Sequence, residues 1–544
     1  MTDALPLAEA AFANRLLPIE WAMVAVFVVG SVTWGVFMHR TAATLEGSFL
    51  AGRRVPGFLA SLSTVATNLN ANDFIGGAGT TYLVGVVLAH QGYANGLALV
   101  LVSLFLVQKL RRLRVFTLGG WLEKRYGFEV GFSYSLIWCL VWMLFNLGLY
   151  LYAGALVLHT LVGWNLYASI VLLSVAAAVI TLSGGYSAVV ATDVLQISLM
   201  FFPFLFLSLA VYGDIGGVWE IAARLPPDKG TFWSNQTPFG PLGLMLAGTF
   251  FMGASYWSTE AQVIQRPLSA RSEEDAVVSY LGATFWFTLL CPIVITLPAL
   301  AAIHYFPGLP NPDLAMPHMI QHFLPRGLYG VTIVGLMAGV FSSVDAQINA
   351  FCAMFTTDVY RRVLRPGRDE RHYLLASRTA GVVFTLAAIG TAVLFSRNEK
   401  GMMLFALSVL ATIMPPFAAV TILGAMLGRM NRPGALAGLA VGGVTAVGLL
   451  IAEHRGLLKP IAGDALFFRT MITFLAAAAC TWTVSMATRH PSCSGREAVD
   501  LSVRISPRVL RMAVVLGLGM AGMVGFWSWF FRGAGAAAAT GAGG

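Results

Sequence analysis

Amide and carboxylate side chains lie close together inside an apolar stretch of the chain. Asn68, Asn72 and Asp73 fall within the segment 61–77, among small, apolar and hydroxyl-bearing residues. Because Asn, Asp and Gly are poor helix formers, we predict that a helix through this segment breaks near 66–70. The carbonyls freed at such a break can coordinate a cation, and the freed amides can bind a polar ligand. The alternative is a kinked helix packed by small polar residues.

Two adjacent serines offer hydroxyl ligands for the same cation. Small and oxygen-bearing residues recur at spacings of three and four along 327–358, which places them on one helix face. They are Gly335, Gly339, Ser342, Asp345 or Ala346, and Asn349. A monovalent cation is held well by several oxygens with little net charge. The carbonyls of Ala66, Leu69 and Gly339 with the hydroxyls of Ser342 and Ser343 would supply that set. The alternative is a packing seam between helices.

A second interrupted helix is predicted over 241–263, where glycine, hydroxyl and acidic residues are mixed as they are in 61–77. Its candidates for contact with a solute are Tyr256, Trp257, Ser258 and Glu260. The two aromatic rings could cover a solute from one side. Packing of these rings against a neighbouring helix is the alternative.

One more carboxylate falls inside an apolar segment. Asp193 lies eight residues beyond Gly185, which places it about 12 Å into a helix that starts at the membrane face. A carboxylate at that depth requires a cation, a proton or an arginine as its partner.

The elements that must position these residues are long apolar helices. The chain has 544 residues, of which 57% are hydrophobic and 11% charged, and its mean hydropathy is +0.76. Apolar blocks of about 20 residues, each long enough to cross a bilayer, recur throughout. We therefore predict an all-α integral membrane protein in a lipid bilayer, with about fourteen transmembrane helices. They are expected at 20–38, 58–84, 88–108, 128–158, 165–183, 187–212, 241–263, 275–303, 327–358, 374–395, 402–427, 433–452, 466–487 and 509–531.

Basic residues predict the orientation of these helices. Most of the 34 Lys and Arg residues fall in alternate loops, and such loops lie on the cytoplasmic side. Both termini are then outside a plasma membrane, and the arginine-rich inner loops fit a bacterial inner membrane. The net charge of +9 is spread over short clusters rather than a basic domain, so we expect no nucleic acid as partner. No obligate protein partner is evident.

Several function classes are excluded by missing motifs. The sequence contains no GxSxG, HExxH, CxxC or GK[ST] pattern, and these motifs carry common hydrolytic, metal-dependent and nucleotide-dependent chemistry. We therefore expect neither an enzyme nor a cofactor, and no transition metal.

The ordered set of these segments resembles the sodium:solute symporter family. The residues that carry the resemblance are Phe49–Arg54, Asn68–Gly76, Gly184–Gly185, Thr192–Gln196, Gln265–Leu268, Ser342–Ser343 and Thr357–Tyr360. The resemblance implies a leucine-transporter-type fold with two inverted five-helix repeats, in which helices 1 and 6 are broken. The expected division is a leading helix in 1–40, repeats in 41–213 and 214–428, further transmembrane helices in 429–532, and a disordered Gly/Ala tail in 533–544.

The resemblance also assigns the coupling ion, sodium, to Ala66, Leu69, Gly339, Ser342 and Ser343. It places Asp193 nearby as a residue of an ion route or second ion. Members with a second sodium site carry further serines, and this chain has Asp345 and Ala346 in those positions. This departure argues against the second sodium site of those members, and Asp193 with Asp345 is named as a second-ion or ion-route candidate.

The expected activity is sodium-coupled import of a small polar organic solute by alternating access. Sodium/sugar members have a lysine in the seventh core helix, whereas all five lysines of this chain lie outside the predicted spans. The predicted solute would be sugar-like, amino-acid-like or amine-bearing. Its expected contacts are Asn68, Asn72, Asp73, Gln91, Tyr256, Trp257, Ser258 and Glu260. The alternatives are a proton-coupled transporter and a receptor or sensor built on the transporter fold.

Overall fold

The chain forms a bundle of helices, as its apolar periodicity predicts. The computed structural model describes residues 16–70, 73–235, 240–397, 402–457, 466–488 and 505–541. Within these ranges there is no β-strand, and extended pairing is limited to an isolated bridge between Val55 and Ala270. Asn72, one of the expected solute contacts, lies outside the described residues.

The helices follow one another with short connections. The α-helices are α2 (Pro18–Phe37), α3 (Leu45–Leu50), α4 (Gly57–Asn68), α5 (Ala78–Val84), α6 (Ala89–Val102), α7 (Gln108–Arg112), α8 (Leu118–Tyr126), α9 (Phe128–Ile137), α10 (Met143–Val162), α11 (Leu166–Ile215), α12 (Val218–Ala223), α13 (Pro227–Gly230), α14 (Leu242–Thr259), α15 (Ala261–Ser269), α16 (Glu273–Phe285), α17 (Leu297–Tyr305), α18 (Ala315–Phe323), α19 (Leu328–Met354), α20 (Glu370–Phe395), α21 (Met402–Met426), α22 (Arg432–His454), α23 (Leu466–Ala487) and α24 (Pro507–Gly541). Wider π-helical turns adjoin several of them, namely η3 (Asp73–Gly77), η5 (Ser103–Val107), η6 (Trp138–Trp142), η7 (Trp286–Leu290), η8 (Pro292–Thr296) and η10 (Phe355–Leu364).

Eleven helices of the described residues are long and apolar enough to cross a membrane. The sequence predicted about fourteen spans. The two numbers differ at α11, which is counted once although it holds two predicted spans. They also differ at the pairs α4 and α5, and α14 and α15: α4, α5 and α15 are too short to be counted, and the 18 residues of α14 are not apolar enough.

The 50-residue helix α11 turns back on itself at Gly185. A methyl group on Gly154 would lie within 4 Å of both Leu173 and Val340, and one on Gly339 would contact Met200. Leu173 and Met200 would be about 40 Å apart in a straight helix, yet both lie at the middle of α19. Gly185, with φ 61° and ψ −165°, allows this reversal. The predicted spans 165–183 and 187–212 are therefore antiparallel arms.

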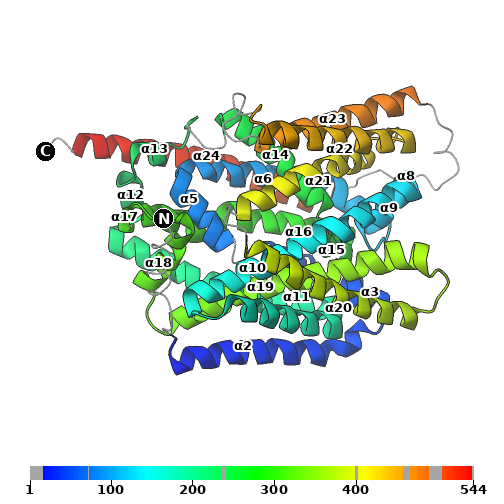
Figure 1. Cartoon of the computed structure of the whole chain (residues 1–544). Helices are drawn as coiled ribbons and strands as arrows, with labels where there is room; N and C mark the ends of the chain where they lie inside the picture. Colours follow the sequence, from blue (N-terminus) through cyan, green and yellow to red (C-terminus); the bar gives the residue numbers. More distant parts are fainter. Residues whose placement is uncertain are drawn as a thin grey trace.

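Two helices are interrupted in mid-bundle, as predicted. The helix α4 ends at Asn68, and Leu69 takes an extended conformation with φ −86° and ψ 109°. Glu260, with φ −68° and ψ 114°, separates α14 from α15. Most long helices run side by side in Figure 1, with α2 along one edge and α23 and α24 along the opposite edge.

The helix α19 is the most enclosed of the eleven long apolar helices of the described residues. Nearly all of its residues from Tyr329 to Met354 are buried, and it packs against α11, α10, α2, α4 and α20. By contrast, α2, α20, α22 and α24 bury only a minority of their residues. Polar side chains on α19 must consequently find partners inside the protein, because water and lipid headgroups do not reach them.

The predicted disordered tail is wrong for its described part. The helix α24 continues to Gly541, and only 542–544 lie outside the described residues. The physical reason is that alanine has the highest helix propensity, so the run 536–539 extends a helix that has already nucleated.

The turn in α11 predicts a specific cost for a side chain at Gly185. A Cβ there would lie 2.9 Å from the Ala42 Cβ and 3.0 Å from the Ser48 Cα, in a backbone region that only glycine adopts readily. We expect Gly185→Ala to lower the free energy of unfolding by about 1–3 kcal/mol, measured as a lower Tm in detergent. The control is Gly213→Ala in the same helix, where an added methyl meets nothing within 4 Å. Equal Tm values for the two variants would contradict the turn.

Candidate functional site

The end of α4 exposes backbone carbonyls in the middle of the bundle. The Leu69 N–H donates the last helical hydrogen bond, to the Val65 carbonyl at 2.7 Å. The next N–H, of Asn70, would close a turn on the Ala66 carbonyl, but it donates instead to the Asp73 carboxylate at 2.9 Å. The Ala66 carbonyl therefore lacks its helical partner, which leaves an oxygen for a cation.

The serine pair of α19 lies against this end of α4. The hydroxyl of Ser343 donates to the Thr67 carbonyl at 2.7 Å, and that of Ser342 donates to the Asp193 carboxylate at 2.5 Å. Both serines are fully buried. Since each hydroxyl proton is directed at an acceptor, the oxygen lone pairs remain available to a cation.

Gly339 completes the contact between the two helices. A Cβ on Gly339 would lie 3.3 Å from the Leu69 carbonyl oxygen and from the Asn70 Cα. The five positions predicted as sodium ligands thus meet where α4 packs against α19. The chemistry of this set is neutral oxygens only, which fits a monovalent cation.

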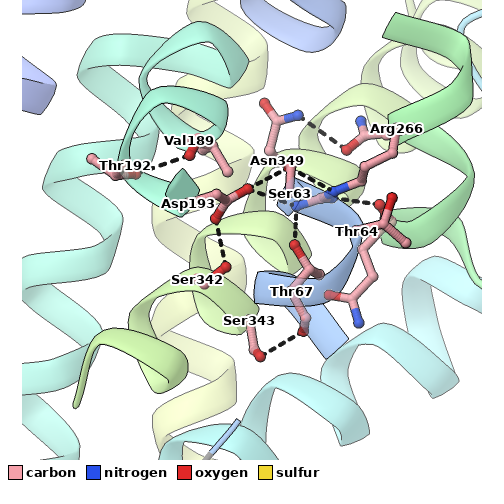
Figure 2. A network of polar contacts seen from close by, with 12 residues as sticks. Ser63, Thr64, Thr67, Val189, Thr192, Asp193, Arg266, Ser342, Ser343 and Asn349 are labelled. Atoms are coloured by element: carbon pink, nitrogen blue, oxygen red, sulfur yellow. Dashed lines mark hydrogen bonds and ion pairs between the residues drawn. The ribbon is translucent and has the colours of Figure 1, made fainter. Parts of the chain in front are cut away.

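Asp193 has an arginine as its partner, one of the three possibilities left open by the sequence. Figure 2 shows its carboxylate between hydroxyls of Ser63 and Ser342, both of which donate to it. A nitrogen of Arg266 lies 3.5 Å from Asp193, and both side chains are fully buried. The pair joins α11 to α15.

The sequence analysis missed the role of Arg266, which lies beyond the predicted span 241–263. The guanidinium donates to the Gln262 carbonyl at 2.5 Å, to the Ser63 hydroxyl at 3.3 Å and to the Thr67 hydroxyl. It thereby ties the first turn of α15 to the last turn of α4. The available signal was the position of Arg266 six residues after the break at Glu260, too close to be a loop residue.

Asp345 lies on α19 one turn beyond Ser342. One carboxylate oxygen accepts a hydrogen bond from Thr181 at 2.9 Å, and the other has no hydrogen-bond partner among the described residues. Asp193 is close enough to interact electrostatically with it. The structure thus brings both second-ion candidates close to Ser342.

Some expected solute contacts meet between the two interrupted helices. The Tyr256 hydroxyl donates to the Asn68 side chain at 2.5 Å, and both residues are half-buried. Asp73 and Gln91 are also half-buried. The Asp73 carboxylate accepts from the Asn70 N–H and so caps the segment that follows the break.

Three other expected contacts are buried and engaged elsewhere. The Trp257 indole donates to Asn95 at 2.8 Å and packs on neighbouring aromatic rings, which is the packing alternative. The Ser258 hydroxyl donates to the Ala254 carbonyl of its own helix. Glu260 accepts from the Trp142 indole at 2.5 Å. The structure therefore does not bring Trp257 and Ser258 to the Asn68–Tyr256 contact, whereas Glu260 is close enough to Tyr256 to interact with it electrostatically.

The break at Glu260 is capped by side chains from other helices. The Tyr134 hydroxyl of α9 donates to the Thr259 carbonyl at 2.5 Å. The Tyr280 hydroxyl of α16 donates to the Trp257 carbonyl at 3.1 Å. These bonds satisfy carbonyls that the interrupted helix leaves without an amide partner.

The fold defines a multi-pass helical membrane protein in which an interrupted helix places backbone carbonyls against a buried serine pair. The chain belongs to the sodium:solute symporter family, whose model matches residues 48–442. It is accordingly a sodium-coupled symporter for a small polar organic solute and not an enzyme.

Similar proteins of known activity span most of the chain. The sodium/glucose cotransporter of Vibrio parahaemolyticus is 26% identical over 77% of this chain and 83% of its own. The sodium/mannose cotransporter of Bos taurus is 27% identical over 88% of each chain. The human sodium/myo-inositol cotransporter is 27% identical over 79% of this chain and 67% of its own.

Solved structures share the fold at low identity. A Na⁺-coupled sialic acid symporter in a substrate-bound outward-open state matches 86% of this chain and 98% of its own, at 20% identity and a TM-score of 0.76. A nucleobase-cation-symport-1 family transporter matches the same shares at 16% identity and a TM-score of 0.55.

The buried pair Asp193–Arg266 predicts a large effect of removing one charge. Asp193→Asn leaves Arg266 enclosed without a counter-charge, so we expect a loss of about 3–5 kcal/mol in the free energy of unfolding, measured as Tm in detergent. Adding Arg266→Gln should recover part of this loss. Arg271→Gln, in an exposed ion pair with Asp275, is the control and should leave Tm unchanged. A wild-type Tm for Asp193→Asn would contradict the pairing.

Proposed function

We propose that sodium binds between α4 and α19 and drives import of a neutral polyhydroxylated solute. The ligands would be the carbonyls of Ala66, Leu69 and Gly339 and the hydroxyls of Ser342 and Ser343. The observation that carries this proposal is the end of α4 at Asn68, which directs unpaired carbonyls at the buried serine pair. A site of neutral oxygens fits sodium better than a divalent ion, which would call for carboxylate ligands.

Sodium would act by stabilising one arrangement of the interrupted helix. Ion and solute are coupled when each prefers the same conformation, and this preference is reciprocal. Here the ion would fix the carbonyls at the end of α4, and Asn68 at the same end contacts Tyr256 of α14. Ordering of the break at the end of α4 would therefore favour solute binding between the two interrupted helices. Asp193 and Asp345, next to Ser342, would line the route of the ion.

The solute class is supported by the charges near the two breaks. The half-buried residues there are Asn68, Asp73 and Tyr256, which offer amide, carboxylate and hydroxyl groups but no cationic group. Arg266 is enclosed by its partners. Such a set hydrogen-bonds hydroxyl groups and disfavours anions. The similar proteins named for glucose, mannose and myo-inositol point the same way.

The arrangement of spans supports two inverted repeats of five helices, over 41–213 and 214–428. The interrupted helices α4 and α14 would be the first of each repeat, and an odd number of spans per repeat inverts the second. With the two arms of α11, the chain would cross the plasma membrane about fourteen times. Both termini would lie outside, as the arginine distribution predicts.

The first experiment measures Tm of the purified protein in sodium, potassium and choline chloride, with and without D-glucose, D-mannose, myo-inositol, proline and sialic acid. We expect sodium alone among the three cations to raise Tm, because a ligand of the native state stabilises it. A neutral polyol or sugar should raise Tm further only in sodium. Equal Tm values in all three salts for a folded protein would refute the sodium site.

The serine pair gives a second test of the same site. We expect Ser342→Ala with Ser343→Ala to weaken apparent sodium affinity about 10- to 100-fold, since two ligands of a charged group are lost. The readout is the sodium concentration that gives half of the Tm increase. Ser174→Ala is the matched control, because its buried hydroxyl donates to a carbonyl of its own helix. Unchanged sodium dependence in the double variant would refute the placement.

A further inference from the structure

Glu260 places a carboxyl group at the interruption between α14 and α15. Its N–H donates to the Tyr256 carbonyl at 2.8 Å, and its own carbonyl accepts from Val263 and Ile264. The residue therefore ends α14 and begins α15. Its side chain is 0% exposed and lies in the interior of a bundle that spans a membrane.

The side chain has a single hydrogen-bond donor. The Trp142 indole donates to one carboxyl oxygen at 2.5 Å, while the other oxygen has no partner among the described residues. The titratable groups that face Glu260 are four tyrosines, one each from α9, α10, α14 and α16. They are Tyr134, Tyr150, Tyr256 and Tyr280.

Three of these four hydroxyl protons are directed at other atoms. Tyr134 donates to Thr259, Tyr280 to Trp257 and Tyr256 to Asn68, as described above. The fourth tyrosine, Tyr150, accepts a bond from Gln262 at 3.1 Å. None of the four tyrosines donates a hydrogen bond to Glu260 in the part of the chain that the structure describes.

The charged groups of the surrounding helices have partners of their own. Arg266, on α15, pairs with Asp193, and Asp73 of η3 is a further acid near Tyr150 and Tyr256.

The other charged groups on helices packed against α14 and α15 also have partners. His90 binds the Phe232 carbonyl, Asp345 binds Thr181 and Arg469 pairs with Glu453. The helices α4 and α21 carry no titratable residue. The charges of α3, α7 and the start of α16 lie at the far end of α15, where Arg111 binds the Ala270 carbonyl.

An ionised Glu260 would thus be a buried charge with one hydrogen bond and, among the residues that the structure describes, no cation beside it. Burial of an unpaired carboxylate costs several kcal/mol, and such groups neutralise instead. Two other acids of the chain differ in this respect. Asp193, which is as buried as Glu260, has Arg266 and two hydroxyl donors. Asp358, which is half-buried, accepts from Thr117, Ser135 and Thr357.

We propose that Glu260 is a proton-binding site of the symporter, a neutral acid in this conformation that gives up its proton when the break between α14 and α15 opens to water. The proposal rests on the proposed function in one respect, because it takes that break as an element that moves. The consequence is a pH dependence that does not come from the sodium ligands. A group that holds its proton only in the closed conformation stabilises that conformation at low pH and ceases to do so as pH rises.

The direct test is infrared spectroscopy of the reconstituted wild-type protein labelled with ¹³C-glutamate, which separates glutamate carboxyls from the buried aspartates. We expect a shifted carboxylic acid C=O band at neutral pH that disappears as pH is raised. The band should be missing in Glu260→Gln. A spectrum that contains no such glutamate band, or one that Glu260→Gln leaves unchanged, would overturn the proposal.

Stability gives a second readout with a matched pair of variants. We expect Tm of the wild type to fall from neutral to alkaline pH more than that of Glu260→Gln, which is a permanent mimic of the neutral acid. Glu260→Asp should keep the pH dependence. If Glu260→Gln abolishes the increase of Tm by sodium while Glu260→Asp retains it, Glu260 is an ionised cation ligand, and the proposal is overturned. The infrared band does not depend on sodium, so it tests the Glu260 proposal alone. The proposed function is tested separately, and it fails if sodium has no effect on wild-type Tm at any pH.

Discussion

The structure depends on one constraint: every backbone carbonyl and amide in the water-poor interior needs a hydrogen-bond or ion partner. Two helices stop in mid-bundle, and each stop frees polar groups that lipid cannot solvate. The break at Glu260 is satisfied by tyrosine hydroxyls from α9 and α16. The break at Leu69 is satisfied only in part, by Asp73 and Ser343. The carbonyls left over at Leu69 are the ones suited to a cation, so the two breaks have different chemical uses.

The buried ion pair couples these two breaks mechanically. Arg266 belongs to the helix that follows one break, and it contacts Ser63 and Thr67 on the helix that precedes the other. Asp193 receives both this guanidinium and the hydroxyl of Ser342. A change in the position of α15 therefore reaches the serine pair through three side chains. Because removal of either charge would leave the other enclosed and unpaired, the network holds four helices in one arrangement.

The sequence predicted the helices and their interruptions better than it predicted which side chains contact one another. The spans and both interruptions follow from apolar length and from poor helix formers in 61–77 and 241–263, since these are local properties. The need for a partner at Asp193 was also evident, because depth alone demands it. The identity of that partner was not, since Arg266 lies 73 residues further along the chain. Trp257 and Ser258 show the converse error: their types suggested solute contacts, but their directions are set by Asn95 and by their own helix.

By itself, the sequence determined that the chain is an all-helical membrane protein, where its helices break, and that the chain reverses between the spans 165–183 and 187–212; it also supplied the residues that are proposed as sodium ligands. Only the tertiary structure decided that Arg266 neutralises Asp193 and that Glu260 has no cation beside it among the described residues. The physical reason is that helix formation depends on residues a few positions apart, whereas the charge state of a buried group depends on all its neighbours. Those of Glu260 come from α9, α10, α14 and α16, and no local pattern encodes which helices meet.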